Sequence, residues 1–524
     1  MPTDVFSRYL KARGEDAFSV CGTDEHGTPI LVRAIEEKTS PKKVVDYYHE
    51  VIKKSLEGVN IKFDIFSRTT REHHYGLTQQ IYSIIKREGY TYKKKVKILY
   101  CEHDKISLPD RLVKGTCPYC GAPDQYGDHC EKCGRTYSAF QLKNPRCAIC
   151  GNPPVIKEKD HIFFALSEFS ERLEKWVKED VKMTRGVKEH VLSWIKEGLH
   201  DWDISRDINW GVPIPDSRDQ VFYVWFDAPI GYISFTKELF EQIGKDWEKV
   251  WIEDDGYIVH FIGKDIIYHH ALFWPAMLMA AGYNLPRELR VRGFATLEGQ
   301  KMSKSRRWYI GLKEFVEIWD PDYLRFYWTI TTGENLDDGD FSLREFSEKI
   351  NKILIGEIGN FVHRVVTLIR RGKIYEGEVV RTILDEVKSM LNALDKDMLE
   401  NQLDKGLQIL IDVAGLGNKT LSEKEPWRHM GEPFTQDLLV TLFVVVLELV
   451  KRIYSFLPSA TERFFKMLNY LDGDLNNILL RDFLEIDGEE IKKHLTNLNK
   501  SKNISPLFKK VTEEEIKKAR KLFG

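Results

Sequence analysis

A short basic loop offers the clearest chemistry in the sequence. It places two lysines three residues apart among small or flexible residues, and it reads Lys301-Met302-Ser303-Lys304-Ser305. Ammonium groups are compact charges that suit a pyrophosphate whose negative charge grows in a transition state. An ordinary solvated basic turn shows the same lysine spacing, so the spacing alone does not decide between the two.

Cysteines occur in pairs with the spacing of metal ligands. Two Cys-x-x-Cys pairs lie close together, Cys117 with Cys120 and Cys130 with Cys133. Each pair presents two thiolates on one edge of a tetrahedron, and two pairs complete a structural zinc site. Packing or redox cysteines are the alternative, which this spacing disfavours.

A third pair, Cys147 and Cys150, needs partners of its own. Cys101 and His103 are the natural completion of a second zinc site, because Cys21 falls in a predicted strand and fits a core position. The alternative leaves the third pair free of metal. Under either alternative we expect at least one metal ion to stabilise the module, because so short a stretch cannot build a core.

A carboxylate stands at the end of a predicted strand. Residues 17–24 form a short apolar segment that runs into a polar turn at Asp24. Open α/β sheets bind ligands at the carboxyl ends of their parallel strands. A helix N-cap aspartate is an equally good explanation when Asp24 is considered alone.

The elements that must position these residues follow an α/β rhythm and then change. Residues 221–232 and 260–270 each read as an apolar strand, a Gly- or Pro-marked turn and a helix. Helical spacing also occurs at 41–57 and 73–88. After about residue 345 the pattern is helical almost throughout and predicts a helix bundle, in the segments 346–371, 378–396, 403–416, 435–455 and 459–468.

Composition bounds the class of protein. A chain of 524 residues should hold roughly three or four domains, and 42% hydrophobic with 30% charged residues is typical of a globular protein. The net charge of −2 means that any nucleic-acid surface must be a local patch. The N-terminus resembles no secretory signal, and the longest apolar run, Leu438–Val450, is too short to span a membrane. We therefore expect a cytoplasmic protein.

These motifs together resemble those of methionyl-tRNA synthetases, which are class I aminoacyl-tRNA synthetases. Residues 301–305 match the signature loop of the class, residues 22–27 match the family's second motif, and residues 202–207 match its Trp-x-Ile-Ser-Arg-Asp segment. The resemblance implies catalytic roles for Lys301, Lys304 and Arg206. It implies an ATP site formed by Lys301, Met302, Ser303, Lys304, Ser305, Lys264 and Asp265. Without the resemblance, Arg206 could equally be a structural ion-pair residue.

The resemblance also implies a methionine pocket. Its residues would be Asp24 for the ammonium group, together with Trp225, Ala228, Pro229, Tyr232, Ile266 and His270. A thioether needs a soft, mostly apolar box, which aromatic and imidazole edges provide. Taken without the family, these aromatic residues would read as ordinary core positions.

Four residues of the helical part match positions that the family uses on the anticodon. Asn360 and Arg364 are spaced i and i+4 and share a helix face, and Trp427 follows Pro426. An amide and a guanidinium can read a base edge, and an exposed indole can stack an unpaired base. A capping amide and a buried tryptophan are the structural alternative.

The implied activity is ATP-dependent formation of methionyl-adenylate and its transfer to the terminal adenosine of tRNA(Met). Mg²⁺ would accompany ATP, and one or two Zn²⁺ ions would be structural. The expected partners are tRNA(Met), ATP and methionine, with no membrane and a monomeric chain. A non-catalytic tRNA-binding relative is the alternative. Another class I synthetase fits less well, because the large editing insertion of the enzymes for branched aliphatic amino acids is absent from the sequence.

The sequence departs from the family pattern at its start. Family members have a strand and a His-x-Gly-His loop ahead of an Asp-x-Phe-x-Arg-Tyr segment, and here that segment is residues 4–9. We therefore expect a doubly wound, Rossmann-type parallel sheet that lacks its first, central strand, and a chain that folds poorly or lacks activity as given. Our hypothesis is a mis-assigned start. An in-frame stop codon just upstream, with no His-x-Gly-His sequence, would contradict it.

The expected domain order follows from these assignments. It is the first half of the catalytic domain (1–90), a zinc-knuckle insertion (91–203), the second half (204–297), the signature-loop region (298–348), an anticodon-binding helix bundle (349–500) and a linker that packs back on the body (501–524).

Overall fold

The computed structural model describes residues 1–127, 130, 132–133, 135, 137–303, 308–470, 475–501 and 505–523. The chain divides into two compact units. One consists of Met1–Ser19, Lys54–Lys62 and Arg290–Gly524, and the other of Val20–Lys53 and Phe63–Leu289. This division groups residues by compactness alone, so the domain boundaries expected from the sequence remain a prediction.

The unit that spans residues 20–289 alternates strands and helices. Its first half contains β1 (Val20–Thr23), α2 (Thr28–Glu36), α3 (Pro41–Gly58), β2 (Ile65–Arg68) and α4 (Glu72–Arg87). Its second half contains β11 (Val221–Phe222), α7 (Val224–Asp227), α8 (Gly231–Ile243), α9 (Glu248–Trp251), β12 (Val259–Gly263), α10 (Trp274–Ala281) and the start of β13 (Glu288–Arg292). The helices predicted at 41–57 and 73–88 are therefore confirmed.

The parallel sheet of this unit consists of two separate strand pairs. β1 lies parallel to β2, with Val20 opposite Ile65 and Thr23 opposite Arg68, and β12 pairs with β13. Within the described residues no strand joins β1 to β12. This topology agrees with the predicted doubly wound sheet that lacks a central strand.

One predicted strand is largely helical. Of residues 221–232 only Val221–Phe222 is a strand, and α7 takes the next apolar residues. A short run that is buried on all sides has no period to distinguish a strand from a helix, so its β-branched and aromatic composition misled the prediction.

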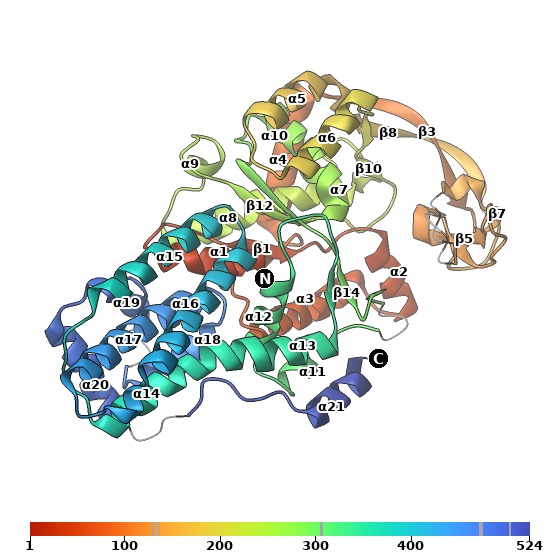
Figure 1. Cartoon of the computed structure of the whole chain (residues 1–524). Coiled ribbons are helices and arrows are strands. Elements are labelled where there is room, and N and C mark those ends of the chain that lie inside the picture. Colours follow the sequence, from red (N-terminus) through yellow and green to blue (C-terminus); the bar gives the residue numbers. More distant parts are fainter. Residues whose placement is uncertain are drawn as a thin grey trace. The chain divides into compact units, whose positions relative to one another are not determined.

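A long antiparallel ribbon separates the two halves and carries a small module. The ribbon is β3 (Thr91–Cys101) paired with β8 (Val155–Phe164), and it leads to the sheet β6-β5-β7 (Figure 1). The remaining elements are β4 (Ile106–Ser107), β5 (Val113–Thr116), β6 (Gln125–Tyr126), β7 (Lys143–Cys147), α5 (Ser170–Glu179), α6 (Arg185–Glu197), β9 (Trp202–Asp203) and β10 (Ser205–Arg206). The core of the module includes five buried or half-buried cysteines, Cys101, Cys117, Cys130, Cys147 and Cys150.

The other unit is mainly helical, with one small sheet. It holds α1 (Pro2–Lys11), β14 (Ala295–Leu297), β15 (Gln300–Lys301), α11 (Leu312–Val316), α12 (Pro321–Thr331), β16 (Gly339–Phe341), α13 (Leu343–Lys349), a π-helical segment (Ile350–Gly359), α14 (Asn360–Gly372), α15 (Arg381–Leu399), α16 (Leu403–Lys424), α17 (Pro433–Arg452), α18 (Pro458–Met467), α19 (Leu475–Leu479), α20 (Gly488–Lys500) and α21 (Glu513–Phe523). The helices from α13 onward confirm the predicted bundle.

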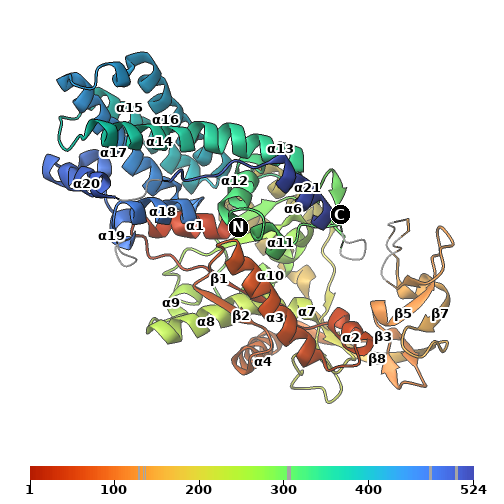
Figure 2. The ribbon, with the colours of Figure 1, turned by 90° about the horizontal axis from the view of Figure 1, so that it is seen from below.

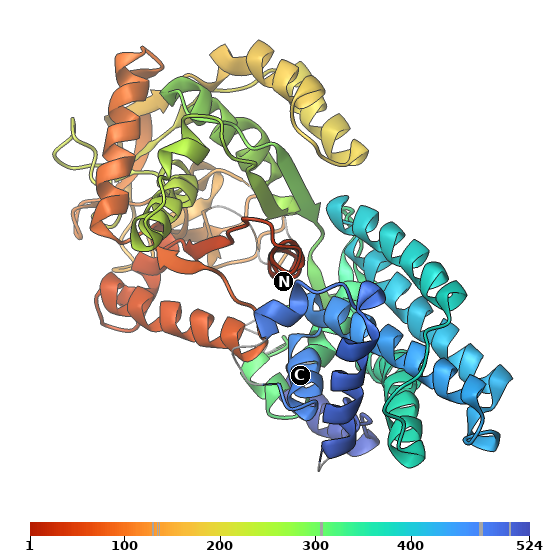
Figure 3. The ribbon, with the colours of Figure 1, turned by 90° about the vertical axis from the view of Figure 1, so that its left-hand side faces the viewer.

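The helices of this bundle pack together through buried apolar residues. α13 and α14 follow each other almost in line (Figure 2), and the cyan-to-blue helices pack side by side in Figure 3. The apolar run Leu438–Val450 lies inside α17 and is buried, as expected from the sequence. None of the described helices is long and apolar enough to cross a membrane.

The C-terminal segment packs back on this unit. The hydroxyl of Tyr323 accepts from the Lys509 backbone N–H and donates to its carbonyl, both at 2.7 Å, and the Asn351 amide oxygen accepts from Val511 N–H at 2.9 Å. Trp319 also lies against Phe523, with ring centroids 6.4 Å apart.

Candidate functional site

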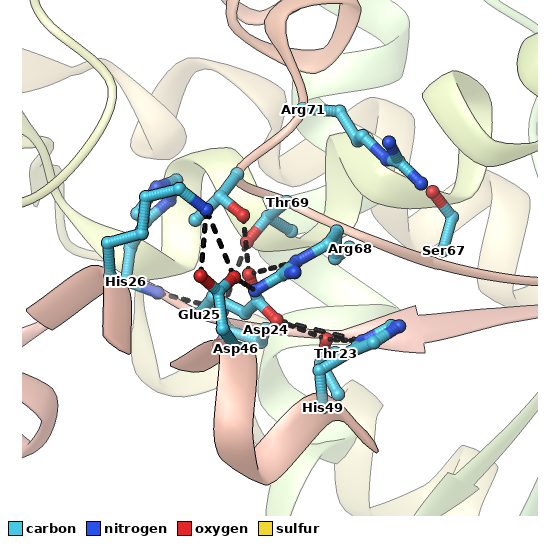
Figure 4. A network of polar contacts seen from close by, with 12 residues as sticks. Thr23, Asp24, Glu25, His26, Asp46, His49, Ser67, Arg68, Thr69 and Arg71 are labelled. Atoms are coloured by element: carbon cyan, nitrogen blue, oxygen red, sulfur yellow. Dashed lines mark hydrogen bonds and ion pairs between the residues drawn. The ribbon is translucent and has the colours of Figure 1, made fainter. Parts of the chain in front are cut away.

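Glu25 anchors the turn beyond the carboxyl ends of β1 and β2. Its side chain is 2% exposed and accepts hydrogen bonds from Thr23 Oγ1 (2.7 Å), Arg68 Nε (2.7 Å) and Thr70 Oγ1 (2.5 Å). Figure 4 shows Glu25 and Arg68 at the centre of this network. The buried ion pair fixes the turn, and Asp24 is left at its exposed edge.

Asp24 lies where the sequence predicted a ligand-binding carboxylate. Its side chain is accessible to solvent, yet protein atoms surround the carboxyl group. This partial desolvation, and then the negative charge of Asp227, raise the pKa of Asp24 to about 7, against the opposing charge of His26. A carboxyl group whose pKa is raised by burial and by a neighbouring charge is typical of functional sites.

A buried histidine–aspartate pair lies beside Asp24 and was missed by the sequence analysis. His26 Nδ1 contacts Asp227 Oδ2, both side chains are fully buried, and His26 Nε2 lies 3.1 Å from Tyr75 Oη. Burial alone would lower the pKa of His26, but the Asp227 carboxylate outweighs this effect and raises the pKa overall, which favours the protonated imidazole. The second oxygen of Asp227, Oδ1, is buried with no hydrogen-bond partner among the described residues.

Tyr232 and His270, both expected in the methionine pocket, form a neutral polar pair. His270 Nδ1 lies 3.1 Å from the Ile266 carbonyl, to which it must donate, so Nε2 accepts from the Tyr232 hydroxyl at 2.9 Å. Burial lowers the pKa of His270 to about 4 and raises the pKa of Tyr232, to which the charges of Cys21 and Asp24 also contribute. Both groups therefore stay uncharged at neutral pH, which suits an apolar ligand.

The other predicted pocket residues occupy the flanks of this pair. Ala228 and the buried Pro229 form the turn before α8, and Trp225 stacks on His269 with ring centroids 3.8 Å apart. Lys264 and Asp265 begin the helical turn after β12, and the charge of Asp265 acts on the pKa of His270.

Arg206 is held by its own segment. Its Nη1 donates to the Ser205 carbonyl at 2.7 Å, and its guanidinium lies over the Tyr223 ring at 3.7 Å. The nearby His161 bridges Asp203 (2.6 Å) and Asp207 (3.1 Å), whose carboxylates raise its pKa to about 9 against the effect of burial. These contacts fix the segment from Asp203 to Asp207 in place.

The signature loop begins in a small hairpin of the other unit. Lys301 lies in β15, Met302 and Ser303 follow, and Ser303 exchanges backbone hydrogen bonds with Trp308 (2.7 and 2.9 Å). The Trp308 indole donates to the Leu297 carbonyl at 3.1 Å and so pins the hairpin base. The predicted Lys304 and Ser305 lie outside the described residues.

The first cysteine cluster gathers the four predicted ligands. One ligand atom from each of Cys117, Cys120, Cys130 and Cys133 lies within 4.8 Å of all the others. Cys117 Sγ is 3.9 Å from Cys133 Sγ, and Cys120 Sγ is 3.5 Å from Cys130 Sγ. A 2.3 Å Zn–S bond gives a tetrahedral edge of about 3.8 Å, so this donor set fits zinc.

The second cluster corrects one predicted ligand. It contains Cys101, Cys147 and Cys150 as expected, but the fourth member is Asp104 and not His103. The Asp104 Oδ2 atom lies 3.3 Å from Cys101 Sγ and 3.1 Å from Cys147 Sγ, while His103 Nδ1 contacts Asp104 Oδ1 at 3.0 Å.

The reason for the correction is local geometry. The Asp104 backbone N–H points to Cys101 Sγ at 3.4 Å, as the Cys133 N–H points to Cys130 Sγ at 3.4 Å in the first cluster. Cys101 and Asp104 thus form the same turn as a Cys-x-x-Cys pair, with a carboxylate in place of the second thiolate. His103, at the third position of that turn, faces outward and is 66% exposed.

Three residues of the bundle form one surface, which we call the recognition face: Asn360, Arg364 and Trp427. The Arg364 guanidinium lies over the Trp427 ring at 5.5 Å, and Trp427 is 38% exposed. Asn360 is also exposed, whereas Pro426 is buried beneath the indole's turn. The sequence analysis did not single out Asn418, which contacts Asn360 and Arg364.

Fold comparison defines the class of protein. A crystal structure of Mycobacterium tuberculosis methionyl-tRNA synthetase bound by methionyl-adenylate superposes with a TM-score of 0.74 over 91% of this chain and 92% of that one, at 22% identity. The chain therefore has the fold of that synthetase.

Sequence comparison defines the branch of that class. The family model described as tRNA synthetases class I (M) matches residues 1–366. Methionine–tRNA ligases from Methanopyrus kandleri and Pyrococcus furiosus are 40% and 42% identical, over 100% and 98% of this chain and 78% and 73% of their own lengths. The chain belongs to the tRNA synthetases class I (M) family.

Proposed function

We propose that this chain is a methionine–tRNA ligase that activates methionine with ATP and transfers it to the terminal adenosine of tRNA(Met). The observation that carries the proposal is the strand-end carboxylate Asp24, whose charge acts on Tyr232 of the neutral Tyr232–His270 pair. These two features match the two ends of methionine, an ammonium group and a neutral thioether. The names of the relatives support the same substrate.

Each residue of the site has a distinct task toward methionine. Asp24 would pair with the ammonium group, and the unpartnered Oδ1 of Asp227 adds negative charge close by. His26 holds Asp227 in place, and its charge opposes the rise in the Asp227 pKa that burial causes. The Tyr232 hydroxyl donates to His270, so neither side chain would offer a free proton donor to the thioether. The sulfur would contact only the aromatic and imidazole rings.

Activation needs positioning more than proton transfer. The methionine carboxylate would attack the α-phosphorus of ATP in line, the bond to the β-phosphate oxygen breaks, and pyrophosphate leaves. The lysines of the signature loop would neutralise the leaving pyrophosphate. The proposed ATP residues are Lys301, Met302, Ser303, Lys304, Ser305, Lys264 and Asp265, with Arg206 on the nucleotide side. Mg²⁺ that arrives with ATP supplies further positive charge.

We propose two structural zinc ions, the second held by Cys101, Asp104, Cys147 and Cys150. All four positions of each cluster are taken by protein, so neither ion has an open position for chemistry. Metal analysis of the purified chain tests this. The Asp104→Ala variant should bind one zinc per chain, whereas His103→Ala, the adjacent control, should retain two. Two zincs in both variants would contradict the role of Asp104.

The recognition face would bind the anticodon. Its indole offers a stacking surface for an unpaired base, and the amide and guanidinium offer hydrogen bonds to base edges.

The test of the main proposal is methionine-dependent ATP–pyrophosphate exchange, followed by charging of tRNA(Met). If the chain folds despite the absent first strand, exchange is expected with methionine and with none of the other amino acids. The Asp24→Asn variant should lose it, while the exposed control Asp219→Asn should not. Retained tRNA binding without any exchange in the unmodified chain would instead favour a non-catalytic tRNA-binding relative.

A further inference from the structure

The amide of Asn418 joins the recognition face to a π-helical segment. Asn418 lies on α16, half-buried, and its Oδ1 accepts from Asn360 Nδ2 at 3.2 Å and lies 3.5 Å from Arg364 Nη1. Its Nδ2 donates to the Glu357 carbonyl at 3.0 Å. All the polar atoms of this amide are therefore used within the protein.

The π-helical geometry explains why the Glu357 carbonyl can take this bond. The segment Ile350–Gly359 ends next to Asn360, whose backbone N–H reaches the carbonyls of both Ile355 and Glu357. Such segments often occur at functional sites, because they displace carbonyls from the regular helical pattern. A carbonyl here must face the NH₂ end of Asn418, so the oxygen end of that amide is turned toward Asn360 and Arg364.

Close packing of two helices brings Asn418 within reach. The preceding residue, Gly417, faces Phe361 of α14, and a Cβ atom at Gly417 would lie only 2.1 Å from that ring. Glycine is needed here for the approach of α16 to α14. Asn418, whose amide contacts α14, directly follows the glycine that lets α16 approach α14.

This arrangement sets the hydrogen-bonding polarity of the recognition face. Asn360 gives an N–H to Asn418, so its own Oδ1 is the group left to accept from a ligand. Arg364 keeps guanidinium N–H groups to donate, beside the stacking surface of Trp427. The acceptor on Asn360 suits the amino group of cytosine, and the donors on Arg364 suit the ring-nitrogen acceptor beside it. Uracil has a carbonyl and a ring N–H at these two positions, so its edge does not match.

We propose that Asn418 is a positioning residue for RNA recognition, which fixes the orientation of the Asn360 amide and the Arg364 guanidinium and so sets base discrimination. The inference rests on the proposed function, because it assumes that the recognition face binds the anticodon. It adds a residue that touches no ligand atom and acts only through its two neighbours.

The experiment measures the affinity of the full chain for a tRNA(Met) transcript and for the same transcript with its anticodon cytosine replaced by uracil. Asn418→Ala should weaken binding of the first about three- to tenfold and reduce the preference over the second by a similar factor. The control Gln408→Ala, an exposed amide on the same helix, should change neither. Methionine-dependent exchange should stay unchanged in both variants, and the melting temperature should stay unchanged in the control.

A shape-conserving variant separates orientation from packing. Asn418→Asp keeps the side-chain volume but places an acceptor against the Glu357 carbonyl, so its binding should fall at least as far as that of Asn418→Ala. Wild-type affinity and preference in Asn418→Asp, or in Asn418→Ala, would overturn the inference.

The Arg364→Ala variant distinguishes failure of the inference from failure of the proposed function. If Arg364→Ala binds both transcripts as tightly as the unmodified chain, the recognition face is not an RNA site and the inference falls with that part of the proposal. If Arg364→Ala weakens binding while the Asn418 variants do not, only the role of Asn418 is refuted.

Discussion

The proposed methionine site around Asp24, which we call the strand-end site, differs from the recognition face in how deeply its charged groups are buried. At the strand end, Asp227 and His26 are buried charges fixed before any ligand arrives, and they alter the pKa of Asp24. The recognition face instead presents a half-exposed indole and an exposed amide that is hydrogen-bonded to Asn418. A small ligand supplies little contact area, so its site must hold ready-made charge. A large RNA can supply its own contact area.

The largest expected effect is on the strand-end site. Asn at position 24 removes the charge that would hold the substrate's ammonium group, and losing one partner of such a desolvated pair costs about 2–5 kcal/mol. We expect kcat/KM for methionine in pyrophosphate exchange to fall about 10²- to 10³-fold in Asp24→Asn, with tRNA affinity unchanged. A parallel loss of tRNA affinity would show that the two regions do not act separately.

A second large effect is expected on stability, at the same site. His26→Ala leaves Asp227 buried without its partner, and breaking a buried ion pair from one side costs about 3–5 kcal/mol. Urea unfolding should show this loss. The double variant His26→Ala/Asp227→Ala should recover part of it, because no unpaired charge remains. No recovery would mean that packing, and not charge, explains the loss.

A smaller effect is expected at the recognition face. Stacking of one base on an aromatic side chain contributes about 1–3 kcal/mol, so Trp427→Ala should weaken tRNA binding about 5- to 150-fold. Exchange without tRNA should be unaffected. Tyr375→Ala, which removes another exposed aromatic ring, serves as the control and should bind tRNA normally. Equal losses in both variants would argue for a diffuse surface.

The same contrast separates what the sequence could predict from what it could not. Helices such as α3 and α16 follow from apolar periodicity, and Asn360 with Arg364 follows from i, i+4 spacing. The His26–Asp227 pair joins residues 201 positions apart, and Asn418 lies 58 positions from Asn360. No local pattern reports such contacts.

Local rules also failed where a residue type was unexpected. His103 was the familiar zinc ligand, but the Cys-x-x-Asp turn places Asp104 at the position equivalent to a second cysteine. The spacing of three residues was the available signal, because it is the same in both clusters. The apolar run after Val221 failed for another reason, since complete burial removes the periodicity that distinguishes strand from helix.

The smallest expected effect, a pH dependence, tests the electrostatics that distinguish the two regions. Asp24 has a pKa raised to about 7, chiefly by desolvation and then by Asp227, with His26 and Glu25 as the other charges acting on it. The ammonium group of methionine stays protonated over this range, so ionised Asp24 can pair with it and protonated Asp24 cannot. The KM for methionine should therefore be constant above about pH 8 and rise about tenfold for each unit below pH 7.

Asp227→Asn removes a negative charge, stabilises ionised Asp24 and should move this rise to lower pH. The affinity for tRNA, measured at the same pH values, should lack the transition. A rise that Asp227→Asn leaves in place would mean that another group titrates, and that the strand-end charges are not coupled as the geometry indicates.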